Sequence, residues 1–179
     1  MRKYWVRIHL FTAAFFAPIF LMMAVSGGLY LIGVKGEVNV TPVTGVKSSA
    51  IDLDASSLED DVRQLLVSNG IDHEFEYLKI NGNRLTTRPT SRDHYELVVL
   101  AHEVTISRME PDLQKSMIEL HMGHGPLLFK DLQKVMAVGL VLVLLSGLWL
   151  GLSAVNLRQA TALTSGAGLA VFVIVALLI

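Results

Sequence analysis

Hydrophobic residues collect in three long runs, one near the N-terminus and two near the C-terminus, while the middle of the chain mixes apolar and polar positions. A membrane-spanning helix needs about 20 predominantly apolar residues. The runs therefore predict transmembrane helices over residues 8–33, 127–155 and 161–179. The first run is too long for a signal peptide and no small-x-small cleavage site follows it, so we expect an uncleaved anchor.

Basic residues beside these runs predict their orientation. Arg2, Lys3 and Arg7 precede the first span, and Arg158 lies in the short link between the second and the third. Because Lys and Arg accumulate in cytoplasmic loops, we expect a cytoplasmic N-terminus and residues 34–134 outside the cytoplasm.

The segment between the first two spans, residues 34–126, has the pattern of an α+β domain that follows a linker of residues 36–50. Ser56 to Glu59 resembles a capping box and opens an amphipathic helix. Three or four antiparallel strands follow, with Asn81-Gly82 predicting a tight turn between the first two. Pro111 then opens a second helix, over residues 112–121. We expect one sheet face to pack on the first helix.

Composition removes several functional classes. Hydrophobic residues make up 52% of the chain and charged residues 17%, which fits a lipid bilayer as the surrounding medium. The formal net charge is −1, so there is no overall attraction to nucleic acid. There are no cysteines, which excludes disulfides and thiolate chemistry. No nucleophile-elbow pattern indicates a hydrolase.

Three histidines lie at the ends of the predicted spans, where ionisable side chains are costly and suggest function. His9 lies at the start of the first span, and His121 and His124 precede the second. Each of these two spans also carries small residues near its far end. They are Ser26, Gly27 and Gly28 in the first span, and Ser146 and Gly147 in the second.

The two spans run antiparallel, so each small-residue notch is expected in the same half of the bilayer as the histidine of the other span. Such notches admit either a neighbouring helix or a flat porphyrin ring. Neutral imidazole is a common axial ligand of haem iron. Helix packing and haem binding therefore remain as alternatives, and the candidate haem-iron ligands are His9, His121 and His124. Two ligands at one depth would require a homo-oligomer or a partner membrane subunit.

Two weaker cation sites are also conceivable. One combines His121 and His124 with a carboxylate such as Glu119, although two histidines alone are a poor zinc signature. The other is the acidic cluster from Asp52 to Asp61, which a solvated helix N-terminus explains better.

Two segments carry a family resemblance. One is Arg7-Ile8-His9-Leu10 followed by Ala17-Pro18 and Ser26 to Leu31. The other is Leu120 to Gly123 followed by the apolar run into Ser146 to Trp149. Together they resemble the PepSY-associated transmembrane family, over about residues 4–152, and the domain between them is similar to a PepSY domain.

That resemblance implies a bacterial inner-membrane protein with a periplasmic domain, related to ferric-siderophore reductases that pass electrons through b-type haem. It implies His9 and His121 as ligands, with His124 an additional candidate. The chain is far shorter than those reductases and has no flavin or nicotinamide motif. We therefore expect a haem-binding electron-transfer subunit linked to ferric iron or siderophore reduction, not a complete enzyme. The alternative is a non-enzymatic regulator or assembly partner of another membrane or periplasmic protein.

Overall fold

The computed structural model describes residues 2–44, 51–100 and 103–178. The chain divides into two compact units. One holds the residues up to Phe20 together with those from Lys134 onward, and the other holds Leu21–Gln133. Four parts of the predictions lie outside the described residues. They are residues 45–50 of the predicted linker, residue 101 between the predicted strands 94–100 and 102–107, residue 102 at the start of the second of these strands, and the last residue of the third predicted span.

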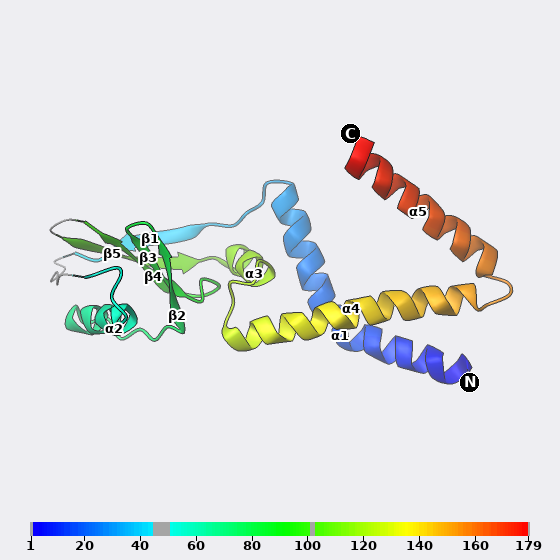
Figure 1. Cartoon of the computed structure of the whole chain (residues 1–179), viewed down its shortest axis with the longest axis horizontal. Coiled ribbons are helices and arrows are strands. Elements are labelled where there is room, and N and C mark those ends of the chain that lie inside the picture. Colours follow the sequence, from blue (N-terminus) through cyan, green and yellow to red (C-terminus); the bar gives the residue numbers. More distant parts are fainter. Residues whose placement is uncertain (1, 45–50, 101–102, 179) are drawn as a thin grey trace. The chain divides into compact units, whose positions relative to one another are not determined.

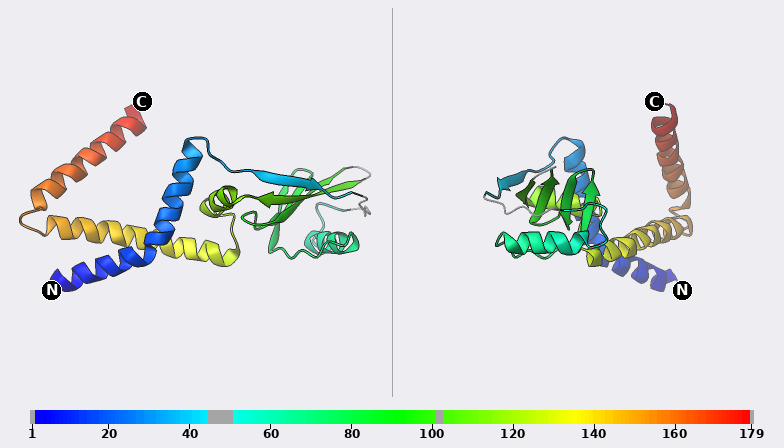
Figure 2. Two further views of the ribbon diagram at one scale, coloured as in Figure 1. Left: turned by 180° about the vertical axis from the view of Figure 1, so that it is seen from behind. Right: turned by 60° about the vertical axis from the view of Figure 1, so that its left-hand side comes forward.

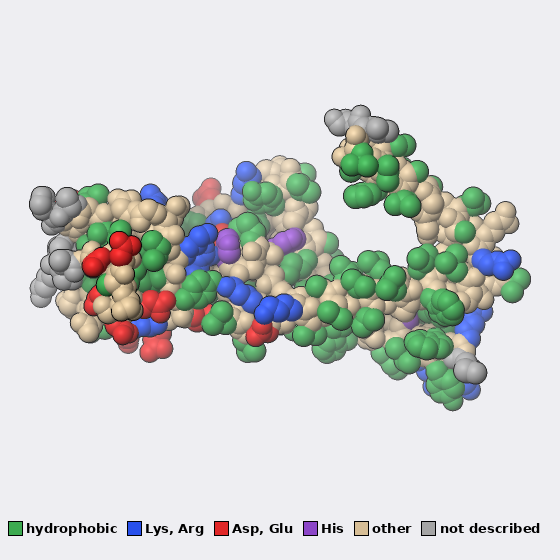
Figure 3. All heavy atoms as spheres, in the orientation of Figure 1, with side chains coloured by type: hydrophobic (Ala, Val, Ile, Leu, Met, Phe, Trp, Pro, Cys, Tyr) green, Lys and Arg blue, Asp and Glu red, His purple; other side chains and the backbone are tan. Residues whose placement is uncertain are grey.

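Within the described part of the chain, three helices are long and apolar enough to cross a membrane. They are α1 (Arg2–Leu31), α4 (Leu127–Leu152) and α5 (Arg158–Leu178). Their hydrophobic side chains are mostly exposed, as lipid-facing residues are, and Figure 3 shows them covering α4 and α5. Helix α1 begins six residues earlier than the predicted span because Arg2 to Arg7 continue the same helix.

The domain between α1 and α4 contains a five-stranded antiparallel sheet with the order β1-β5-β4-β3-β2, in which β1 is Val38–Pro42. Strands β2 (Tyr77–Asn81) and β3 (Arg84–Arg88) form a hairpin through Gly82, whose φ of 60° suits glycine. This confirms the predicted turn. Strands β4 (His94–Val99) and β5 (Val104–Pro111) pair next, with Leu97 opposite Ile106.

Helix α2 (Leu58–Ser68) covers one face of this sheet (Figures 1 and 2). Its apolar residues recur at helical spacing and meet alternate residues of the strands, which point to the same face. The resulting core confirms the predicted packing of helix on sheet. Its fully buried members include Val62, Leu65, Leu66, Leu85, Leu97 and Ile106.

Helix α3 (Leu113–His121) follows β5 directly and contacts this strand (Figure 1). Asp112 caps it, since its side chain accepts a hydrogen bond of 2.6 Å from the Lys115 amide. The same carboxylate accepts one of 2.9 Å from the Glu37 amide, so the cap also fixes the start of the chain's first strand.

Two expectations were wrong. The predicted linker contains strand β1 (Val38–Pro42), which pairs with β5 and extends the sheet to five strands. The capping box is also absent. Ser57 takes the N-cap position of α2 but its hydroxyl donates to Asp61, while Glu59 accepts from the Leu78 amide at 3.2 Å. Glu59 thus occupies an edge of β2 that strand pairing leaves open.

Candidate functional site

His9 and Ser146 meet within the unit that contains the two chain ends. The Nδ1 atom of His9 lies 2.8 Å from the Oγ atom of Ser146. His9 is placed by the first turns of α1, and Ser146 by the C-terminal half of α4. The Ser146 hydroxyl also lies 3.1 Å from the carbonyl oxygen of Val143, one helical turn earlier. This arrangement, with Gly147, is called the His9 site below.

Gly147 allows the imidazole to approach the backbone of α4. A Cβ atom at this position would lie 3.2 Å from Cε1 of His9, closer than ordinary van der Waals contact. Beside Ser146 is an apolar cavity of about 580 Å³, within the size range of small-molecule sites. Its walls are aromatic and aliphatic, from Trp5, Leu142, Leu145, Leu148, Trp149, Leu150 and Leu152.

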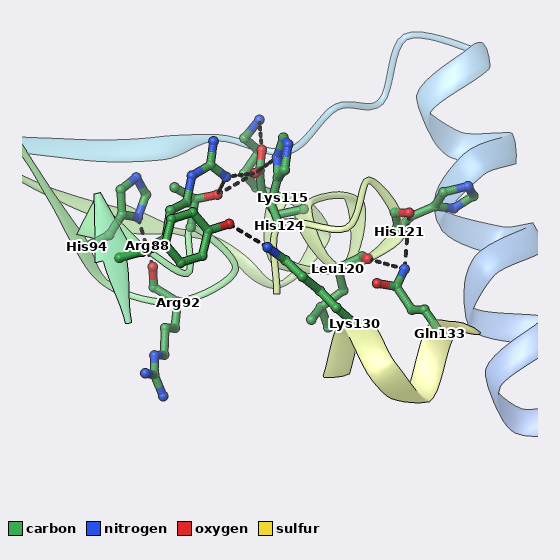
Figure 4. A network of polar contacts seen from close by, with 12 residues as sticks. Arg88, Arg92, His94, Lys115, Leu120, His121, His124, Lys130 and Gln133 are labelled. Carbon is green, nitrogen blue, oxygen red and sulfur yellow. Dashed lines mark hydrogen bonds and ion pairs between the residues drawn. The ribbon is translucent and has the colours of Figure 1, made fainter. Parts of the chain in front are cut away.

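His121 and Ser26 form the corresponding pair in the other unit. The Nδ1 atom of His121 lies 3.2 Å from the Oγ atom of Ser26. Ser26 is fully buried and its hydroxyl also lies 3.2 Å from the carbonyl oxygen of Met23. In Figure 4 the His121 ring points toward α1. This arrangement, with Gly27, is called the His121 site below.

Gly27 has the same role as Gly147, since a Cβ atom there would lie 3.0 Å from Cε1 of His121. A cavity of about 200 Å³ adjoins the ring and is lined by Ser26, Gly27, Tyr30, Ile118, His121 and Met122. Gly28 differs, because nothing lies within 4 Å of a Cβ placed on it. The sequence grouped Gly28 with Ser26 and Gly27, but the structure does not bring it into the site.

The expected pairing of each histidine with the notch of the other span is therefore present in both units. One physical detail differs from the expectation. The imidazole itself lies against each glycine, so the notch accommodates the histidine side chain.

His124 is placed elsewhere. Helix α3 ends at His121, and Gly123 follows with φ of +77°, which turns the chain. His124 therefore does not share a face with His121. Its Nδ1 atom lies 2.7 Å from Oε2 of Glu119, and Figure 4 shows the His124 ring apart from that of His121. Among the described residues, no group of three or more His, Asp or Glu side chains is arranged to hold a metal ion.

Glu119 is the centre of a buried polar network. The sequence indicated Glu119 only as a possible ligand in a cation site. It accepts hydrogen bonds from Thr90 at 2.6 Å and from His124, and pairs with Lys115 at 2.9 Å. Arg88 lies 3.9 Å away and is itself buried. Burial alone would raise the pKa of Glu119, but the hydrogen bonds from Lys115, Thr90 and His124 outweigh it and lower the pKa to about 2.

This network joins the sheet to the connection between α3 and α4. The Thr90 amide also donates to the His124 carbonyl at 3.1 Å. Nearby, Lys130 in the first turn of α4 donates to the Tyr77 hydroxyl, and Glu76 accepts from the Leu127 amide at 2.7 Å. The contacts hold the start of α4 against the domain. No sequence signal could have found them, because their partners lie 29 to 53 residues apart.

Comparisons with protein families, with curated proteins and with solved structures found no significant match for this chain.

Proposed function

We propose that this protein is a haem-binding membrane subunit for electron transfer, with His9 and His121 as axial ligands at two separate sites. The observation that carries the proposal is the repeated arrangement of an imidazole, a serine and a glycine. Each ring is held through Nδ1 by a serine, and the opposite ring nitrogen, Nε2, has no hydrogen-bond partner among the described residues. Ligating histidines are commonly held in this way.

Both sites have apolar surroundings, as haem requires, and the cavity beside the His9 site is the larger of the two. Haem is large and mostly apolar, and its properties depend on a dry environment and on the hydrogen bonds of its ligands. Trp5 and Trp149 line the cavity beside the His9 site, and Tyr30 and Met122 line the one beside the His121 site. Haem held there would carry single electrons. The chain's own contribution is to orient the imidazoles and to exclude water.

Each site offers one imidazole, so a haem held by two side chains would need a further ligand. We propose that a second copy of this chain or a partner membrane subunit supplies it. Both rings are accessible for such a contact, since His9 is half-buried and His121 is exposed. His124 is a poorer candidate because Glu119 already binds it.

The resemblance noted in the sequence extends this proposal. It suggests a PepSY-type periplasmic domain, a bacterial inner-membrane location with a cytoplasmic N-terminus, and a link to ferric iron or siderophore reduction. The positions of Arg2, Lys3, Arg7 and Arg158 support that orientation.

A difference spectrum tests the proposal. The full chain is purified in mild detergent from haem-replete cells, and the reduced-minus-oxidised visible spectrum is recorded. We expect a b-type signal that His9→Ala and His121→Ala each reduce by about half, because each removes the one ligand of its site. His73→Ala is the matched control, since His73 lies in the sheet domain and contacts Thr87. An unchanged haem content in both ligand variants would argue for helix packing instead.

A further inference from the structure

The second contact of each serine fixes the direction of its hydrogen bonds. Ser26 Oγ lies 3.2 Å from the Met23 carbonyl oxygen, and Ser146 Oγ lies 3.1 Å from that of Val143. A carbonyl oxygen can only accept, and a serine hydroxyl has one proton to donate. When that proton goes to the carbonyl, the hydroxyl oxygen must accept from the imidazole.

We infer that the neutral rings of His9 and His121 both adopt the Nδ1–H tautomer, and that Ser146 and Ser26 are the positioning residues that fix it. The hydrogen bond runs from Nδ1–H of each histidine to Oγ of its serine. The lone pair of each ring then lies on Nε2. The partner of one ring nitrogen decides which form a histidine adopts.

The glycines make this arrangement possible. Gly27 and Gly147 lie directly after the serines, and the Cε1 atom of each ring lies 3.0 and 3.2 Å, respectively, from where a Cβ atom would stand. The Cε1 atom lies between the two ring nitrogens, so the ring rests on the helix with Nδ1 directed at the serine. A side chain at either glycine would lift the ring and lengthen the bond to the hydroxyl. The serine and the glycine therefore act together on one imidazole.

The inference deepens the proposed function, since it names Nε2 as the atom that would bind the iron. It does not need haem for its test. In free histidine the Nε2–H form predominates, so a ring held as Nδ1–H differs from the unrestrained state in a way that can be measured.

His94 provides an internal reference for the nitrogen signals of an Nδ1–H ring. His94 Nδ1 lies 2.9 Å from the carbonyl oxygen of Arg92, so this nitrogen must donate (Figure 4). Burial lowers the pKa of His94, which keeps its ring neutral at mildly alkaline pH. Its nitrogen signals mark where those of a neutral Nδ1–H ring in this protein should fall.

The experiment is nitrogen NMR of the full chain, labelled with ¹⁵N-histidine, expressed in haem-deficient cells and placed in lipid nanodiscs at about pH 8.5, where an ordinary histidine is neutral. Loss of a signal in His9→Ala or His121→Ala assigns each ring. We expect both rings to match the His94 pattern, with Nδ1 protonated and Nε2 bare. Ser146→Ala and Ser26→Ala should each shift only their own histidine toward the pattern of free histidine.

Two further variants separate orientation from general stability. Ser146→Thr and Ser26→Thr keep the hydroxyl and should keep the Nδ1–H pattern. Thr164→Ala removes a hydroxyl that bonds to the Ala160 carbonyl in α5, and it should leave both rings unchanged. Nε2–H rings in the unmodified chain, or Nδ1–H rings that survive both alanine changes, would overturn the inference. A colourless protein with Nδ1–H rings would contradict haem binding and leave the inference standing.

Discussion

His9 contacts Ser146 across 137 residues of sequence, with 2.8 Å between Nδ1 and Oγ. His121 and Ser26 repeat the contact, with α1 now supplying the serine and α3 the histidine. Both serines are followed by a glycine that the imidazole approaches closely. A single such contact is common in helix packing. Two such contacts with the same serine–glycine order and the same ring nitrogen indicate that both rings need to be held in the same way.

Gly27 and Gly28 provide a matched pair for testing that requirement. Gly27→Ala would place Cβ 3.0 Å from Cε1 of His121, whereas Gly28→Ala meets nothing within 4 Å. Both changes make the same gain in helix propensity, about 0.5–1 kcal/mol. We therefore expect Gly27→Ala to displace the His121 ring and to lower haem content, with Gly28→Ala unchanged. Haem per protein in purified samples measures this, and equal loss in both variants would contradict it.

Gly147→Ala is the corresponding change at the His9 site. Its Cβ would lie 3.2 Å from Cε1 of His9, so the ring must move less than at the His121 site. We expect a smaller loss of haem than for Gly27→Ala. The comparison is made on the same samples by visible spectroscopy, and a greater loss for Gly147→Ala would show that ring displacement does not set haem content.

Gly139 lies at a tight contact between α4 and α1. A Cβ at Gly139 would lie 2.4 to 2.7 Å from ring carbons of Phe16, which is itself buried. Gly139→Ala should destabilise the packed helices by about 1–3 kcal/mol, the usual cost of overpacking. Thermal unfolding in detergent measures it, with Gly166→Ala in open space as the control. Adding Phe16→Leu should restore part of the loss.

The lowered pKa of Glu119 predicts that the free energy of unfolding depends on pH. Its pKa is lowered from 4.5 in an unrestrained chain to about 2 in the folded protein. A carboxylate with a lowered folded pKa stabilises the protein above its unfolded pKa, and this stability is lost as pH falls from about 4.5 to about 2. Glu119→Gln should cost about 2 kcal/mol at neutral pH, because Lys115, Arg88 and His124 lose their shared carboxylate.

The measurement is the free energy of unfolding of both proteins between about pH 7 and pH 2. The difference between the original chain and Glu119→Gln should shrink as the pH falls through that window. A constant difference over the whole range would mean that the charge of Glu119 is not what stabilises the network.

Gly36 occupies a position that other residues cannot take. Its φ is +67°, and a Cβ there would lie 2.4 Å from the backbone nitrogen of Lys115. Gly36→Ala should therefore destabilise the domain by more than about 1 kcal/mol. Gly70→Ala tests the contribution of φ alone, because its φ is +73° with open space around it. Denaturant unfolding should show the larger loss for Gly36→Ala.

Much of the fold could be predicted because its signals are local. The apolar runs predict α1, α4 and α5 from length and composition alone, and the Asn81-Gly82 turn predicts the β2–β3 hairpin. Strand β1 was missed because Val38–Pro42 is only five residues long and runs directly into a Thr-, Gly- and Ser-containing stretch that is typical of a linker. Its pairing with β5 depends on contacts more than 60 residues away.

Helix geometry predicted which residues of the candidate site lie close together, but not how their side chains contact one another. Antiparallel spans of similar length place each notch near the other span's histidine, which is what the sequence indicated. The sequence could not show that Ser26 and Ser146 bind the rings, since that depends on side-chain rotamers. Nor could it show that Gly123 turns His124 away toward Glu119, because either a helix or a turn fits Gly123-His124-Gly125.

The reduced-minus-oxidised visible spectrum of the purified full chain tests the haem assignment most directly. The account predicts a b-type spectrum that weakens in His9→Ala and His121→Ala and persists in His73→Ala. A folded but colourless preparation of the unmodified chain from haem-replete cells would contradict it.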